Sequence, residues 1–335
     1  MEKFWPSNKN KLNLEIILHK EIIETSNKYV KDQEVVAGFI PGENPVECVS
    51  ISNRNMRPYP ELNLYYEEAD ALILHHVVHL LKCGFQNILV LSGDTDVLVI
   101  LLHFFFVLQE MGLKELWVKS GIRESVRHIP VHTLASKLGK ELCEVIPAVH
   151  VLTGSDYTSK CGTKHASLAA NPVQYLSGFG KTCSKDELDI QVKQAELYLI
   201  KVLKKGCQCQ SMNELRSMMY HHAKISSFTK LPPTSSVIRG HILRSFFVTN
   251  VIRTLLSKSH FQLDPKDYGY YEDDNMLLPC VSENHLPYEF VLFCNCLKCA
   301  TTKCKCRQRG VDCCRFCHCR NHAGDPCRNQ YQSRE

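Results

Sequence analysis

The stretch QNILVLSGDTDVL at residues 86–98 decides how the middle of this chain folds. Residues 86–92 form a nearly continuous apolar run, which is typical of a parallel strand buried on both faces. Gly93 ends the run, and the apolar residues after Asp94 recur at helical spacing. The segment therefore predicts a strand that passes through a tight turn directly into a helix.

Strand and helix patterns alternate on both sides of this unit. Helices are expected at 8–30 and 66–82, and short strands at 34–40, 46–52, 115–119 and 126–129. This order predicts the α/β fold class, with a mostly parallel sheet flanked by helices. Further helical patterns follow at 158–170, 185–205, 212–222 and 238–257. We expect four parts: an α/β core over 1–160, a helical extension over 161–258, a linker of low periodicity over 259–289 and a cysteine-rich domain over 290–330.

Composition limits the class of protein. The 335 residues are 44% hydrophobic, which is enough to form a proper core. The start, MEKFWPSNKNK, lacks the apolar run of a secretory signal, and the longest apolar stretch is too short to span a bilayer. We therefore expect a nuclear or cytoplasmic protein that is not secreted and does not enter a membrane. In such a compartment the 18 cysteines are expected as thiols or metal ligands.

Acidic residues stand in three short segments where an α/β sheet would bring them together. They are EEAD at the start of the 66–82 helix, DTD after the 86–92 strand, and GSD where a helix meets a loop at 154–156. Ligands of open α/β sheets bind beyond the carboxyl ends of strands. Converging carboxylates need a cation, and hard oxygen donors suit Mg²⁺ or Mn²⁺. The alternative is structural: acids favour first helical turns, and an aspartate after a strand often caps the next helix.

The C-terminal segment is rich in cysteine and in basic residues. Residues 294–329 hold eight Lys and Arg against two Asp, a local charge of +6 within a chain total of +5. Such an excess is expected where a segment meets phosphates. The cysteine spacing runs C-x-C-x2-C-x4-C-x-C-x6-C-x3-C-x-C-x7-C. A zinc cluster, a redox thiol tail and an ordinary two-zinc finger are the alternatives that the spacing leaves open.

The succession EEADALI, SGDTDVL and LTGSDYTSKCGTKHA resembles the flap-endonuclease branch of the PIN-type nucleases. The resemblance implies a two-metal site for phosphodiester hydrolysis, held by Glu68, Asp70, Asp94, Asp96 and Asp156. It also implies a helix-turn-helix start that grips a DNA backbone through Gly162 and Lys164, although Thr163 replaces the family's second glycine. The family's opening strand with its first aspartates is not evident. The expectation is therefore either a longer reading frame or a repurposed copy of the nuclease.

The cysteine spacing resembles the tesmin/TSO1-type CXC domain. The resemblance implies three zinc ions, with some sulfurs bridging two metals, held by Cys294, Cys296, Cys299, Cys304, Cys306, Cys313, Cys317, Cys319 and Cys327. It also implies DNA as the partner, with phosphate contacts from Lys303, Lys305, Arg307 and Arg309. Lys303 occupies the position at which some members carry a tyrosine that enters the minor groove. Phosphate contact is thus a safer expectation than sequence-selective binding.

The order of nuclease-like core, helical extension and CXC cluster resembles proteins linked to mobile elements in invertebrate genomes. The expected function is divalent-metal-dependent hydrolysis of DNA, assisted by DNA binding through the zinc cluster. The alternative is a catalytically inactive DNA-binding or scaffold protein derived from such a nuclease. The sequence leaves the oligomeric state open.

A smaller motif lies on the 66–82 helix and at its end. His75 and His79, and His79 and Cys83, are four residues apart and so share one helix face. They are either a metal site or packed and solvated helix positions.

Overall fold

The computed structural model describes residues 8–29, 33–40, 45–53, 55–64, 69–182, 184–222, 231–257, 263–273 and 276–280. In the C-terminal part it describes residues 294–297, 299, 301–308, 310, 312–313, 317–320, 327 and 329. Among these residues, no helix is both long and apolar enough to cross a membrane.

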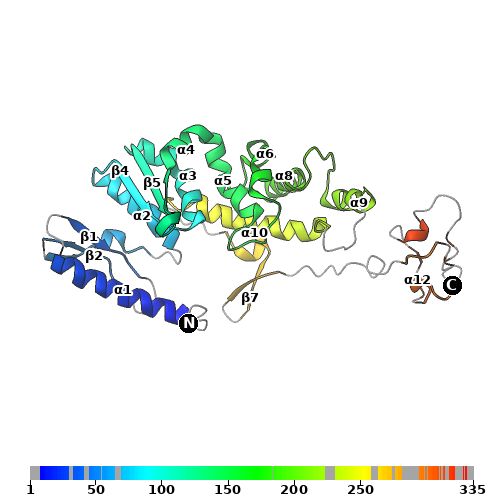
Figure 1. The fold of residues 1–335 in the computed structure, drawn as a ribbon, viewed down its shortest axis with the longest axis horizontal. Coiled ribbons are helices and arrows are strands. Elements are labelled where there is room, and N and C mark those ends of the chain that lie inside the picture. The colour runs from blue at the N-terminus through cyan, green and yellow to red at the C-terminus, as the bar shows by residue number, and fades with distance from the viewer. Residues whose placement is uncertain are drawn as a thin grey trace.

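An N-terminal unit joins one long helix to a small antiparallel sheet. Helix α1 (Asn8–Tyr29) packs on strands β1 (Glu34–Ala37) and β2 (Val49–Ser52), and β3 (Asn55–Pro58) pairs with β2. The side chains of Phe39, Cys48 and Leu62 form its buried cluster. The predicted helix and both predicted strands are confirmed, and Figure 1 shows α1 lying along this sheet.

The central unit contains the predicted strand–turn–helix. Helix α2 (Ala69–Lys82) leads to β4 (Asn87–Leu91), α3 (Thr95–Glu110), β5 (Glu115–Ser120), β6 (Arg127–Pro130) and α4 (Val131–Leu138). Helix α3 crosses over between β4 and β5, which are therefore parallel. Its apolar residues, including Leu101, Phe105 and Leu108, are buried in the core between α2 and the sheet. All these elements agree with the sequence prediction.

The prediction of a mostly parallel sheet is wrong. The described strands form three small sheets, in which β4–β5 is the single parallel pair. Strand β6 returns beside β5 after the short turn η2 (Arg123–Ser125), and so short a connection can only join antiparallel strands. Strand β4 lies at the sheet edge, where Leu89 and Leu91 are 50% and 69% exposed. Its apolar run is thus buried on one face alone.

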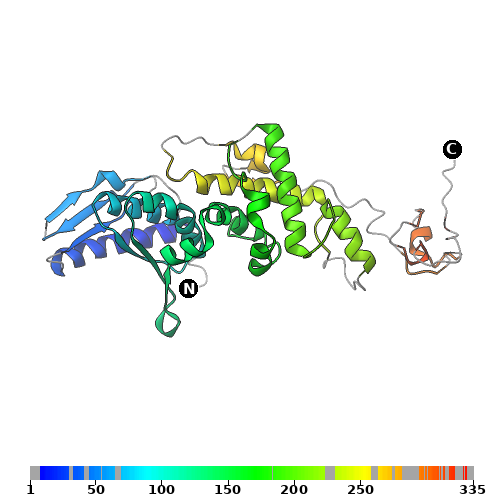
Figure 2. The same ribbon diagram turned by 90° about the horizontal axis from the view of Figure 1, so that it is seen from above.

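Six helices form the next unit. They are α5 (Lys140–Thr153), α6 (Lys164–Ala169), α7 (Pro172–Leu176), α8 (Lys185–Leu203), α9 (Met212–His222) and α10 (Ser235–Arg253). Tyr198, Phe179 and Phe246 are fully buried among them. Helix α10 contacts both α5 and α8, and Figure 2 shows it extending along the helical unit. The expected helix does not extend over residues 158–163, since Thr163 caps α6, which begins at Lys164.

Part of the stretch expected to be a linker is folded. The 3-10 helix η4 (Pro265–Tyr268) precedes an antiparallel hairpin of β7 (Tyr270–Asp273) and β8 (Met276–Pro279). The ring of Tyr268 stacks on Phe246 of α10, with centroids 5.4 Å apart and planes 6° apart. The rings of Tyr268 and Tyr270 also contact Phe247 of α10, and a few such isolated aromatic contacts leave no periodic pattern in the sequence.

The described C-terminal residues have cysteine sulfurs as their core. Eight cysteines are buried there, with the partly buried Cys296 packed against them. The short helix α12 (Lys305–Gln308) and the 3-10 helix η5 (His318–Arg320) lie among them. Figure 1 draws this cysteine-rich unit apart from the α/β body.

Candidate metal centres

The turn between β4 and α3 places two aspartates at the carboxyl end of the strand. Asp94 is the N-cap of α3, and its Oδ1 accepts a hydrogen bond from the Asp96 backbone N–H at 2.9 Å. The Asp94 N–H itself donates to the Ser92 Oγ at 3.1 Å. The capping role that the sequence left open is therefore real, and it fixes the turn on which both carboxylates stand.

A third carboxylate joins them from α2. Oxygens of Asp70, Asp94 and Asp96 all lie within 4.8 Å of one another, with Asp94 exposed and the other two half-buried. Oxygens opposite each other around Mg²⁺ are about 4.2 Å apart and adjacent ones about 3 Å. The three side chains could therefore hold one hard divalent cation.

His150 of α5 contacts this carboxylate group. Its Nε2 lies 2.7 Å from the Asp96 Oδ1, and its side chain is only 10% exposed. The sequence prediction missed this residue. The available signal was a single histidine among Val149, Val151 and Leu152, six residues before Asp156, on an otherwise apolar helix face. Such a histidine marks a buried polar contact, but the sequence does not name its partner.

Of the other two predicted acids, Glu68 lies outside the described residues. Asp156 is exposed on the turn after α5, which the Ser155 and Thr158 backbone groups close by exchanging hydrogen bonds. It does not belong to any group of metal-ligating atoms found within 4.8 Å among the described residues. Of the four predicted carboxylates that the structure describes, it thus brings together three.

The predicted phosphate-binding turn has a packing role. Gly162 has a φ of +81°, and a Cβ added there would collide with Cγ1 of Val202 on α8. Helix packing therefore requires glycine at this position, whether or not a phosphate also approaches it. The Thr163 side chain caps α6 by accepting the Ala166 N–H at 3.2 Å. Lys164 begins α6, and its side chain is outside the description.

The cysteine sulfurs of the C-terminal unit gather in overlapping quartets. Sulfur separations include 3.3 Å for Cys294 and Cys299, 3.6 Å for Cys306 and Cys317, and 3.6 Å for Cys299 and Cys313. Three quartets have all their sulfurs within 4.8 Å: Cys294, Cys299, Cys313 and Cys319; Cys294, Cys306, Cys313 and Cys317; Cys294, Cys296, Cys299 and Cys304. These are metal-ligand distances, so the unit is a cysteine cluster that could bind zinc.

The ninth predicted ligand, Cys327, borders the first quartet. Its thiol shares hydrogen bonds with Cys319, Cys313 and Cys299. Asn329 supports this end of the cluster, since its side-chain amide donates to the Cys313 Sγ at 3.3 Å. At the centre, burial opposes ionisation, but N–H and thiol donors lower the pKa of Cys294 to about 6. The predicted nine cysteines thus lie together.

The predicted phosphate contacts border this cluster. Lys303, Lys305 and Arg307 are exposed, and the Arg307 Nη1 donates to the Cys299 carbonyl at 3.5 Å. Arg309 lies outside the described residues. The described cations therefore face solvent beside the sulfurs.

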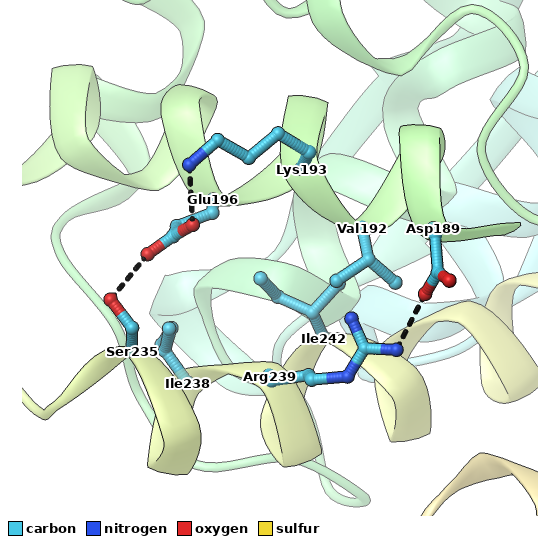
Figure 3. A pocket seen from close by; sticks show the side chains of 8 residues that line it. All are labelled: Asp189, Val192, Lys193, Glu196, Ser235, Ile238, Arg239 and Ile242. Carbon is cyan, nitrogen blue, oxygen red and sulfur yellow. Dashed lines mark hydrogen bonds and ion pairs between the residues drawn. The ribbon is translucent and has the colours of Figure 1, made fainter. Parts of the chain in front are cut away.

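A pocket between α8 and α10 contains none of the predicted site residues. Its volume is about 440 Å³, and its polar side chains are paired with one another: Asp189 with Arg239 at 2.6 Å, Lys193 with Glu196 at 3.1 Å, and Glu196 with Ser235 at 2.8 Å (Figure 3). Burial opposes ionisation of Glu196, but the Met212 N–H, Ser235 and Lys193 lower its pKa. This group joins the starts of α9 and α10 to α8 and is a structural junction.

Comparison with known proteins finds no matching family model, curated protein or solved structure. The support for the α/β fold and for the cysteine cluster therefore comes from the structure alone. The resemblances to flap endonucleases and to CXC domains rest on the motifs quoted above.

Proposed function

We propose that this chain binds DNA through a C-terminal cluster of three zinc ions. The observation that carries the proposal is the overlap of the three cysteine quartets. Isolated zinc fingers use four ligands for each ion and share none, whereas these quartets share sulfurs. Shared sulfurs are the signature of a polynuclear thiolate cluster.

The nine cysteines together supply the number of zinc–sulfur bonds that three zinc ions need. Three four-coordinate zinc ions need twelve bonds, which nine thiolates supply when three of them bridge. Cys327 borders Cys299, Cys313 and Cys319 and completes one ion with them. The other two ions take Cys294, Cys306, Cys313 and Cys317, and Cys294, Cys296, Cys299 and Cys304. Each pair of ions then shares one bridging sulfur: Cys294, Cys299 or Cys313.

The charge of this cluster explains its basic surroundings. Nine thiolates with three Zn²⁺ carry a charge of about −3, which nearby cations offset. Lys303 and Lys305 are exposed beside the cluster. Their ammonium groups are therefore available to phosphates. Neutralised phosphates release counterions, so binding through these residues weakens as salt rises.

Zinc counting and salt-dependent DNA binding test the proposal. Native mass spectrometry of the full chain should detect three zinc ions in the cluster, and Cys299→Ser should lose more than one ion because it removes a bridge. Lys303→Gln with Lys305→Gln should lower the slope of log affinity against log salt by about two. Lys114→Gln, an exposed lysine at the start of β5, is the matched control. An unchanged slope in the double variant would rule out these contacts.

A second candidate function is hydrolysis of phosphodiesters at the β4–α3 turn. It is favoured by the convergence of Asp70, Asp94 and Asp96 from two elements at the carboxyl end of a strand. These residues would hold one Mg²⁺ or Mn²⁺, which supplies a water of lowered pKa and neutralises charge on the phosphate. His150 would hold the Asp96 carboxylate in place through its hydrogen bond.

A cleavage assay with Mg²⁺ or Mn²⁺ on flap, duplex and single-stranded DNA tests this candidate. Asp94→Asn is the informative variant, because asparagine caps a helix as well as aspartate does and removes only the charge. Activity should be lost while the unfolding transition is unchanged. Equal cleavage by both proteins would exclude hydrolysis at this turn and leave DNA binding as the function.

A further inference from the structure

Three donor groups meet at the end of α2, away from both candidate centres. The Nε2 of His79 lies 2.8 Å from the Tyr59 Oη and 3.4 Å from the Cys83 Sγ. His79 and Cys83 are four residues apart at the end of α2, and Tyr59 follows strand β3 of the N-terminal sheet. The site therefore combines two parts of the chain that are 20 residues apart in sequence.

The His79 Nε2 is the atom that the phenol and the thiol share. A single ring nitrogen faces both a phenol and a thiol, and it can accept only one proton well. A cation at their common centre would satisfy the nitrogen, sulfur and oxygen lone pairs together. We propose that Tyr59, His79 and Cys83 bind a zinc ion that joins the N-terminal sheet to α2.

The nitrogen–sulfur separation fits zinc, whereas the 2.8 Å between the His79 Nε2 and the Tyr59 Oη is a direct hydrogen bond that would lengthen on coordination. Zinc bonds of about 2.0 Å to nitrogen and about 2.3 Å to sulfur place the two atoms roughly 3.5 Å apart across a tetrahedral angle. The observed 3.4 Å between the His79 Nε2 and the Cys83 Sγ agrees with this edge. Cys83 is exposed, which leaves the ion a path from solvent and room for a water as fourth ligand.

The helix end favours a cation over a reactive thiolate. Cys83 stands at the C-terminus of α2, where the Cys83 N–H donates to the His79 carbonyl at 3.0 Å. The negative end of the helix dipole attracts a cation and disfavours an unpaired thiolate. Gly84 follows with a φ of +91° and open space around it, so nothing described there blocks an ion.

The three ligands should differ in strength. The phenol of Tyr59 keeps its proton near neutral pH and therefore binds zinc more weakly than an imidazole nitrogen or a thiolate does. Its oxygen is then the weakest donor, and His79 with the Cys83 thiolate provides most of the affinity. Binding displaces the thiol proton of Cys83.

The zinc content of the full chain, measured by native mass spectrometry under buffered zinc, tests this site. Cys83→Ser and His79→Gln should each carry one zinc ion fewer than the original chain. Tyr59→Phe should keep the ion but release it to a lower chelator concentration. Cys280→Ser is the matched control, since Cys280 is also exposed and stands after β8, away from α2.

The comparison is a difference in zinc content, so it does not depend on how many ions the C-terminal cluster holds. Equal zinc in the original chain and in Cys83→Ser would overturn the proposal. Loss of an ion in Cys280→Ser as well would overturn it too, because any exposed thiol would then have the same effect. Circular dichroism of each variant verifies that the total helix content is unchanged.

Discussion

His150 connects the buried face of α5 to the exposed carboxylates. Its Nε2 is 2.7 Å from the Asp96 Oδ1, and the two residues are 54 positions apart. A buried partner of this kind orients a metal-binding carboxylate, and removing it typically costs 10- to 100-fold in metal affinity. We expect His150→Leu to weaken Mn²⁺ binding by roughly that factor. His150→Gln, whose amide can reach the same oxygen, should retain most of the binding.

Electron paramagnetic resonance of free Mn²⁺ during titration measures both affinities. Unchanged Mn²⁺ binding in His150→Leu, with binding lost in Asp94→Asn, would show that the histidine has only a structural role. Loss of binding in neither variant would instead argue against the ion site itself. The two results are therefore distinguishable.

We expect His103 to make the free energy of unfolding depend on pH. Burial, with a smaller contribution from Arg253, lowers its pKa to about 4, despite a hydrogen bond to the Cys143 carbonyl. The unfolded chain binds a proton near pH 6.5, whereas the folded chain stays neutral to about pH 4. The contribution of His103 to the free energy of unfolding is therefore fully present above pH 6.5. It is lost as the pH falls toward 4, and the total loss is roughly 3 kcal/mol.

Urea unfolding at several pH values measures this dependence. His103→Gln should remove the steep part of the fall in unfolding free energy between pH 6.5 and pH 4. The variant without the titrating ring should therefore lose less stability over that interval. Parallel pH profiles for the two proteins would show that the imidazole does not titrate in this way.

At the scale of elements, Gly162 joins α6 to α8. An alanine there would adopt an unfavourable positive φ and also strike Val202. Gly162→Ala should lower the unfolding free energy by roughly 2–4 kcal/mol, the cost of backbone strain plus overpacking. Gly206→Ala is the control, since Gly206 has a φ of +75° but nothing within 4 Å. It should cost only about 1 kcal/mol.

Thermal unfolding of both variants measures the difference. Adding Val202→Ala should recover part of the loss in Gly162→Ala and none in Gly206→Ala. Equal destabilisation by the two glycine substitutions would show that the clash is relieved without cost. DNA affinity of the same variants then tests the phosphate contact that the resemblance implies.

Individual elements were predictable from the sequence, but their contacts with distant parts of the chain were not. The periodicity of α3, α8 and α10 and the apolar run of β4 depend on neighbouring residues and are visible locally. The antiparallel return of β6 was encoded locally, because only six residues separate β5 from β6 and so short a connection cannot join parallel strands. The prediction of a mostly parallel sheet overlooked this length. The stacking of Tyr268 on Phe246 joins two separate elements, and no local pattern encodes it.

The candidate sites follow the same distinction. The cysteine ligands repeat at short spacing, so their clustering was predictable from residues 294–327 alone. The convergence of Asp70 with Asp94 and Asp96 was predictable because the strand end and the helix start were both visible. The contact of His150 with Asp96 was not predictable, since a single histidine on an apolar helix carries no information about its partner.

At the scale of the whole molecule, the cores of the body and of the C-terminal unit differ in kind. The body buries large apolar side chains such as Leu101, Phe105 and Phe246. The described core of the C-terminal unit consists of cysteines, whose sulfurs can be held together by metal but contribute little apolar burial. The two should therefore respond differently to removal of metal.

A zinc chelator should unfold the C-terminal unit and leave the body folded. Amide hydrogen exchange, measured by mass spectrometry of the full chain, should show protection lost over residues 294–329 and retained in α3, α5, α8 and α10, because the apolar cores there need no ion. Mg²⁺ chelation is the control, since oxygen ligands hold that ion and thiolates do not. Protection that survives in the cysteine unit after zinc is removed would mean that it folds without metal, and the three-zinc assignment would fail with it.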